Sequence, residues 1–239
     1  MSNTFAAASH LSVHLARWEN IRTPPDGRIG PPAGSPSTWL VGADEGRHGS
    51  EFSSQLATEF IAVGAHPDAD SATACAAAAV PEFDGAAEVW SAAFEPLRSI
   101  GELNWVGGGR LEATGSRADG PLAVMTSVGW DLGPAFDAAR ALAFAGAVAE
   151  VRKSMWDDPP DGMSSHQNFT FPGVLIHDGI TLTTWRDVDA MKAYAYQPGA
   201  HKSAMDAFRI DETADRTSFT RLRPLETHGT WWGIDPFGW

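Results

Sequence analysis

The residues best suited to chemistry lie in one predicted helix, which begins after Pro198 and Gly199 and carries His201 in its first turn. His201, Met205 and Phe208 stand at positions i, i+4 and i+7, so they share one face of that helix. A neutral imidazole on an otherwise apolar face is suited to ligate haem iron. Two alternatives stay open from this spacing: a core histidine bonded to a backbone carbonyl, and a surface histidine.

The residues on either side predict the elements that must position this helix. A strand ends at Trp185, and the carboxylates of Asp187 and Asp189 are suited to cap a first helix, which precedes the one with His201. After the second helix, a further strand leads to Trp231. The helix that carries His201 is therefore expected to pack on a sheet.

The order of elements in the second half is β, α, β, β, α, β, which predicts an α+β fold of the ferredoxin-like type. Its first four elements are expected at residues 122–128, 135–155, 169–176 and 180–185. A weak internal duplication aligns residues 94–98 with residues 219–223. Two ferredoxin-like (βαββαβ) halves packed face to face would form a dimeric-α+β-barrel-type fold within one chain. The expected divisions are a Pro/Gly-rich N-terminal arm (1–36), a first half (37–109), a linker (110–120) and a second half with the functional site (121–239).

Composition and charge exclude several classes of protein. The 239 residues carry a formal net charge of −13, which disfavours nucleic acid and anionic membrane surfaces as partners. No apolar run reaches ~18 residues, so no membrane span is expected, and no signal peptide is recognisable. The single cysteine, Cys75, excludes a disulfide framework and favours a cytoplasmic location. No histidine and carboxylate grouping has the spacing of a zinc or non-haem iron site.

The block from Trp185 to Trp231 resembles the spheroidene monooxygenase family. Order, spacing and residue type agree over several elements of roughly fifty residues. The matching positions are Trp185, Ala190-Met191, Ala193-Tyr194-Ala195-Tyr196, His201, Ala204-Met205, Arg209, Phe219-x-Arg221 and Gly229-x-Trp231.

This resemblance implies a haem-dependent monooxygenase with haem b as its cofactor and His201 as the proximal iron ligand. The apolar side chains expected around the pocket are Trp185, Met205, Phe208 and Trp231. Arg221 and Arg140 are candidates to contact the haem propionates or bound oxygen. His177 is a candidate distal acid or base, and a turn histidine is the alternative reading. The expected substrate is a small apolar or aromatic molecule, with electrons from an external donor.

Two other functions stay open, because barrels of this kind host several chemistries. The group includes haem-dependent aldoxime dehydratases, so a haem lyase is the first alternative. It also includes cofactor-free antibiotic-biosynthesis monooxygenases, so a cofactor-free monooxygenase or a ligand-binding barrel is the second. The long arm and the acidic balance differ from a carotenoid oxygenase, which makes a small secondary metabolite an equally good substrate. Homodimer formation through the arm is a further expectation.

Overall fold

The computed structural model describes residues 8–22, 38–44, 57–101, 111–131, 133–134, 136–170, 178–211 and 214–239. The elements within these residues follow in chain order: β1 (His10–Arg22), β2 (Thr38–Asp44), β3 (Ala57–His66), α1 (Ala69–Ala77), the 3-10 turn η1 (Pro81–Phe83), β4 (Glu88–Gly101), β5 (Leu122–Gly129), α2 (Ala138–Asp157), β6 (Met163–Thr170), β7 (Asp178–Trp185), α3 (Val188–Tyr196), α4 (Ala200–Asp211) and β8 (Arg216–Gly229).

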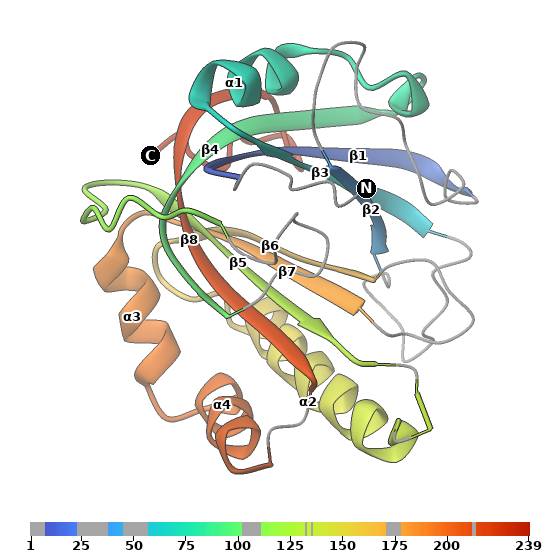
Figure 1. The fold of residues 1–239 in the computed structure, drawn as a ribbon, viewed down its shortest axis with the longest axis vertical. Helices are drawn as coiled ribbons and strands as arrows, with labels where there is room; N and C mark the ends of the chain where they lie inside the picture. The colour runs from blue at the N-terminus through green and yellow to red at the C-terminus, as the bar shows by residue number, and fades with distance from the viewer. Residues whose placement is uncertain are drawn as a thin grey trace, which may run out of the picture.

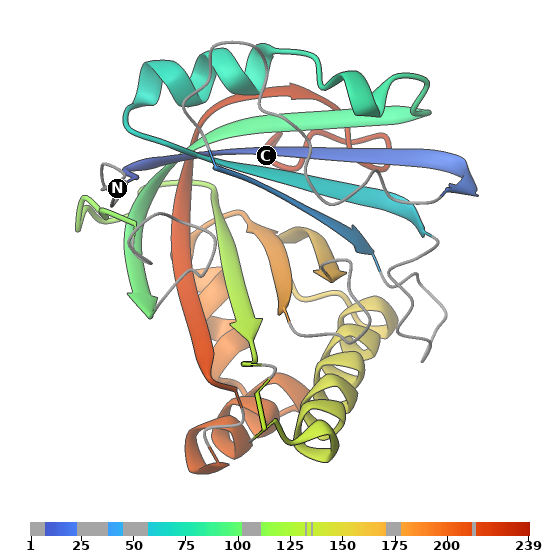
Figure 2. The same cartoon turned by 45° about the vertical axis from the view of Figure 1, so that its right-hand side comes forward.

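The strands form a closed antiparallel barrel in the order β1-β3-β2-β6-β7-β5-β8-β4 (Figures 1 and 2). Strands β1 to β4 are arranged as β4-β1-β3-β2, and strands β5 to β8 are arranged in the same way as β8-β5-β7-β6. The β4–β8 and β2–β6 pairs join the two sets of strands. The predicted α+β class with an antiparallel sheet is confirmed.

Strand β1 lies in the segment that was expected to be an arm, and it is an integral strand of the barrel between β3 and β4. Its alternation explains why: Leu11, Val13 and Leu15 face the barrel interior, whereas Ser12 and His14 face outward and are buried there. Ser12 and His14 are covered by α1, so these polar residues do not mark an exposed segment.

The barrel interior is an apolar core built from alternate residues of the strands. Its buried members are Ala8, Leu11, Val13, Leu15, Ile61, Val63, Ala65, Trp90, Ala92, Phe94, Leu111, Ala123, Met125, Phe169, Ile180, Leu182, Leu222 and Trp231. Trp231 belongs to the segment after β8, and Phe237 of the same segment packs against this core. The C-terminal segment therefore contributes to the interior of the barrel.

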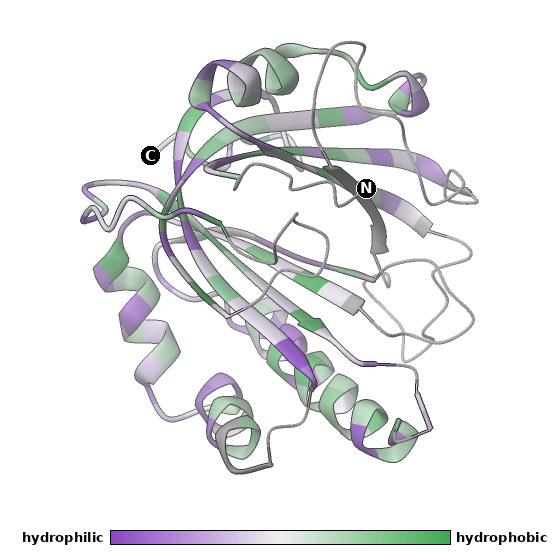
Figure 3. Ribbon diagram, in the orientation of Figure 1, coloured by the Kyte–Doolittle hydropathy of each residue, from purple (hydrophilic) through white to green (hydrophobic). Residues whose placement is uncertain are grey.

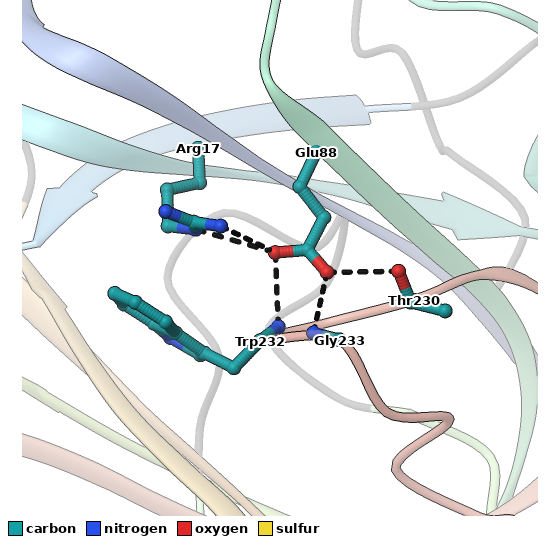
Figure 4. A network of polar contacts seen from close by, with 5 residues as sticks. All are labelled: Arg17, Glu88, Thr230, Trp232 and Gly233. Atoms are coloured by element: carbon teal, nitrogen blue, oxygen red, sulfur yellow. Dashed lines mark hydrogen bonds and ion pairs between the residues drawn. The ribbon is translucent and has the colours of Figure 1, made fainter.

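Glu88, at the start of β4, links the C-terminal segment to Arg17 of β1 through hydrogen bonds (Figure 4). Its carboxylate accepts hydrogen bonds from Thr230 Oγ1 at 2.8 Å and from the backbone N–H groups of Trp232 at 3.0 Å and Gly233 at 2.8 Å. Arg17 donates to the same carboxylate at 2.9 Å, and its guanidinium lies 4.1 Å from the centre of the Trp232 ring. Burial of Glu88 opposes ionisation, but these hydrogen bonds outweigh it, and the pKa of the carboxyl group is lowered.

Glycines at both ends of the β4–β8 pair allow the two strands to approach closely. Gly101 and Gly229 have positive φ angles of 85° and 77°. A Cβ atom at Gly101 would lie 1.9 Å from the Thr217 carbonyl oxygen, and one at Gly229 would lie 2.2 Å from that of Val89. Only glycine fits both the conformation and the space at these positions.

The helices cover the outside of the barrel on two sides. Helix α1 lies over β1, β3 and β4, and helices α2, α3 and α4 lie on the side of β5 to β8 (Figure 1). None of the helices in the described ranges is long and apolar enough to cross a membrane. The outward side chains of β5 and β7 pack against α3 in a second apolar cluster, built around Leu122, Val124, Trp185 and Met191.

Several predicted boundaries are confirmed. Trp185 ends β7, and Asp187 caps α3 by accepting from the Ala190 N–H at 2.7 Å. The strand predicted at 169–176 starts earlier than expected, because β6 spans Met163–Thr170. Its polar run has no alternation of apolar residues, and residues 171–177 lie outside the described part of the chain.

Candidate functional site between β5 and α4

His201 lies in the first turn of α4 and is half-buried. Its Nδ1 atom lies 3.4 Å from the carbonyl oxygen of Ala195, at the end of α3. Burial lowers the pKa of His201, and the contact with Ala195 opposes this effect only in part, so the ring is neutral at neutral pH. With the proton on Nδ1, the lone pair is on Nε2, which has no hydrogen-bond partner among the described residues. This nitrogen is available to a ligand.

Tyr194 connects His201 to the sheet. The centre of its ring lies 5.1 Å from that of His201 and 5.5 Å from that of Trp185. Trp185 is 2% exposed, and its Nε1 donates to Thr183 Oγ1 at 2.9 Å, which fixes the indole on the outer face of β7. Trp185, Tyr194 and His201 therefore form one aromatic row that runs from the sheet to the start of α4.

A second aromatic row connects the end of α4 to the sheet through α2. The ring of Phe208 lies 5.8 Å from that of Phe144, which in turn lies 5.4 Å from Trp130. Trp130 directly follows β5, whereas Trp185 pairs with Leu122 at the beginning of β5. The two rows therefore link residues of α4 to opposite ends of β5.

The outer face of the sheet is incompletely covered between these rows. Thr126, in the middle of β5, is exposed, and Val128 and Thr181 are half-buried, although their inward neighbours are buried. No residue from 200 to 208 of α4 is fully buried, even on the face that carries His201, Met205 and Phe208. Figure 3 shows apolar residues along much of α2, where Leu142 is 62% exposed. The helices therefore leave part of the outer face of β5 and β7 accessible.

The structure brings together only part of the predicted site. Trp185, His201 and Phe208 lie in this layer, with Met205 on the same face of α4. Trp231 does not join them, because it is fully buried inside the barrel, on the other side of the sheet.

Three further predicted residues are not brought to His201 either. Arg221 faces outward from β8 but lines a separate pocket with Lys192. Arg140 is exposed in the first turn of α2, and its backbone N–H donates to the cap residue Asp137 at 3.1 Å. His177 lies outside the described residues.

Sequence reasoning missed a buried polar group in the same layer. His166 and Asn168 on β6 and Arg152 on α2 are 4%, 7% and 8% exposed. The ring of His166 lies 4.3 Å from that of Trp156, which is one turn after Arg152 on the same face of α2. The sequence gives little sign that His166 lies in a strand, since alternation of apolar residues, the main signal for a strand, is weak in this segment.

Comparisons with known proteins support the fold. No family model matches the sequence, and no curated protein matches it. Among solved structures, a crystal structure of aldoxime dehydratase matches with a TM-score of 0.55 and 11% identity, covering 91% of this chain and 82% of that one. An aldoxime dehydratase in complex with butyraldoxime matches with a TM-score of 0.54 and 12% identity, covering 92% and 81%. A protein from Lactobacillus acidophilus NCFM described as a monooxygenase covers 93% and 96% at 11% identity, but its TM-score of 0.39 is too low to argue from. At these identities the similarity establishes the α+β barrel fold alone.

Proposed function

We propose that this chain is a haem-dependent monooxygenase that binds haem b between β5 and α4, with His201 as the proximal iron ligand, and oxidises a small apolar or aromatic substrate. The observation that carries this proposal is the state of His201: a half-buried, neutral imidazole whose Nε2 has no partner among the described residues. A haem ligand needs such a nitrogen beside an apolar surface.

The residues around His201 fit this cofactor. The Ala195 carbonyl holds the proton on Nδ1, which directs the lone pair of Nε2 outward, and Tyr194 restricts the plane of the ring. Met205 and Phe208 continue the apolar face along α4 and would exclude water from the site. Haem bound there would supply the iron needed for oxygen activation, and electrons would come from an external donor.

A second candidate function is a haem-dependent dehydratase, because the two solved structures with TM-scores above 0.5 are aldoxime dehydratases. Elimination of water requires an acid or base near the substrate. His166, buried in the same layer, is the side chain of the described region best placed for that role. Turnover without oxygen and without an electron donor would favour this function over oxygenation.

We also infer that the barrel consists of two ferredoxin-like halves within one chain. The repeated strand orders β4-β1-β3-β2 and β8-β5-β7-β6 support this division. Helices α1 and α3–α4 occupy equivalent places before the last strand of each half.

Absorption spectroscopy tests the cofactor directly. We expect the purified protein to gain a Soret band with one equivalent of haemin, and His201→Gly to bind haemin at least about tenfold more weakly, since the coordinate bond is lost. Added imidazole should restore the band in His201→Gly, which a purely structural role of His201 would not explain.

His228→Ala is the matched control and should bind haemin normally, because His228 contacts Glu226 on β8. Haemin binding that is unchanged in His201→Gly would refute the ligand assignment. A wild-type spectrum without a Soret band would favour a cofactor-free barrel.

A further inference from the structure

A pocket lies on the other side of α3 from His201. It has a volume of about 640 Å³ and is lined by Leu97, Arg98, Gly115, Ser116, Arg117, Ala118, Asp119, Gly120, Asp187, Val188, Asp189, Lys192 and Arg221. Lys192 and Tyr194 are two residues apart on α3, so they point roughly 200° away from each other. Because Tyr194 contacts His201, this pocket is distinct from the proposed haem site.

Four cations line this pocket, and none of them forms an ion pair within the described residues: Arg98, Arg117, Lys192 and Arg221. The other cations whose side chains are described all have partners. Six pair with carboxylates: Arg17, Lys153, Arg186, Lys202, Arg216 and Arg223. Arg140 and Arg152 also have partners. In a chain with a net charge of −13, the cations without an ion pair among the described side chains thus all line this pocket.

Arg221 and Arg98 stand opposite each other on β8 and β4, which places like charges on neighbouring strands. The Nε atom of Arg221 is buried without a hydrogen-bond partner in the described structure. Burial of the Arg221 guanidinium lowers its pKa, and the charge of Arg98 lowers it further. A bound anion would relieve both the repulsion and the unsatisfied donor.

The three carboxylates of the pocket do not neutralise these cations. Asp187 accepts the Ala190 N–H at the start of α3 and contacts Arg186 at 3.2 Å. Asp119 and Asp189 are exposed, and neither pairs with a cation of the pocket. The four cations of the pocket therefore have no ion-pair partner in the described part of the chain, against three carboxylates that line it.

We propose that this pocket binds a small molecule through a phosphate or carboxylate group, held by Arg221 and Arg98 from the sheet and by Lys192 from α3. Arginine side chains match the planar, bidentate geometry of both kinds of oxyanion, and the volume lies in the usual range for small-molecule sites. Binding here does not depend on haem or on His201, so it stands if the proposed function fails.

Calorimetric titration of the full chain with pyrophosphate and with citrate, at constant ionic strength set by chloride, tests the site and separates phosphate from carboxylate ligands. We expect at least one of the two anions to bind, and Arg221→Gln and Lys192→Gln each to weaken that binding about tenfold or more. Lys153→Gln is the matched control, because it removes an exposed lysine from α2 that already pairs with Asp157. Absence of binding by both anions, or equal weakening by Lys153→Gln, would overturn the proposal.

Thermal unfolding gives a second, independent measurement. In chloride alone, Arg221→Gln should unfold at the same temperature as the wild type or higher, because it removes a repelling charge opposite Arg98. The anion that binds should raise the melting temperature of the wild type but not that of Arg221→Gln. A melting temperature of Arg221→Gln several degrees below that of the wild type in chloride would mean that Arg221 is a structural cation, which contradicts the site.

Discussion

Tyr194 is the residue on which the position of His201 depends most directly, because its ring contacts both His201 and Trp185. We expect Tyr194→Ala to lower the free energy of unfolding by about 2 kcal/mol, since a half-buried ring is lost from between the sheet and α4. Tyr194→Phe keeps the ring and should cost about 0.5 kcal/mol. Urea denaturation of both variants measures the difference. Similar losses in the two variants would show that the hydroxyl group, and not the ring, holds this layer together.

The position of a site residue could be predicted from the sequence where it depends only on neighbouring residues. Asp187 caps α3 and His201 lies in the first turn of α4, because capping and helix-breaking signals act over a few residues. Trp231 was placed near His201 and lies inside the barrel instead. Alternation along a strand divides residues between two faces, but it does not say which face meets the helices. That depends on pairing between distant strands.

A buried group of polar side chains lies between helix α1 and strands β1 and β3. Ser12 Oγ lies 2.8 Å from His66 Nε2 and 3.4 Å from Cys75 Sγ, and His14 Nε2 lies 4.0 Å from the same sulfur. Burial, together with the nearby His66 and His228, lowers the pKa of His14 from 6.5 to about 4. His66 is lowered to about 4 as well, mainly by burial, although Asp68 opposes the shift.

These histidines predict a loss of stability in weak acid. In the unfolded chain these histidines take up protons below about pH 6.5, whereas in the folded chain they do so only near pH 4. The free energy of unfolding is therefore highest above pH 6.5 and decreases as the pH falls toward 4. For His14 the loss is on the order of 3 kcal/mol when complete. Urea denaturation at pH 7.5, 6 and 4.5 measures it, and His14→Gln should show a smaller difference between these values. Equal stability of the wild type at pH 7.5 and 4.5 would mean that the pocket beneath α1 admits water and solvates the charged ring.

The two sets of strands follow the same order, but their helices pack differently, and this difference sets the place of the candidate site. Helix α1 packs closely on β4 through small residues, Ala72 and Ala76 against Ala93. On the opposite side, α4 is held by aromatic rows at its two ends and leaves Thr126 exposed between them. Helix α1 therefore covers its side of the sheet closely, whereas part of the outer face of β5 is exposed.

At this scale, the order of elements predicted the fold class better than residue matching did. The βαββαβ order of the second half agrees with the observed strand order β8-β5-β7-β6. The proposed alignment of Phe94 with Phe219 does not match their positions in the fold, because Phe94 faces the barrel interior and Phe219 faces α3. The register of the β4–β8 pair is irregular at two places, where Leu225 of β8 and Leu97 of β4 have no paired residue. Each extra residue interrupts the alternation of its strand, and the sequence pattern does not predict where this happens.

The closure of the barrel by its C-terminal segment leads to a prediction with a matched pair of neighbouring tryptophans. Trp231 is fully buried in the barrel core, whereas Trp232 is 37% exposed and stacks under Arg17. Trp231→Ala should lower the free energy of unfolding by about 3–5 kcal/mol, because it leaves a cavity in the core. Trp232→Ala should cost only about 1 kcal/mol, because the lost cation–π contact is close to solvent. Urea denaturation of both variants distinguishes the two roles. If Trp231→Ala were as mild as Trp232→Ala, the C-terminal segment would be a surface strap over a barrel that is already complete, and the contacts of Glu88 would hold that strap without stabilising the core.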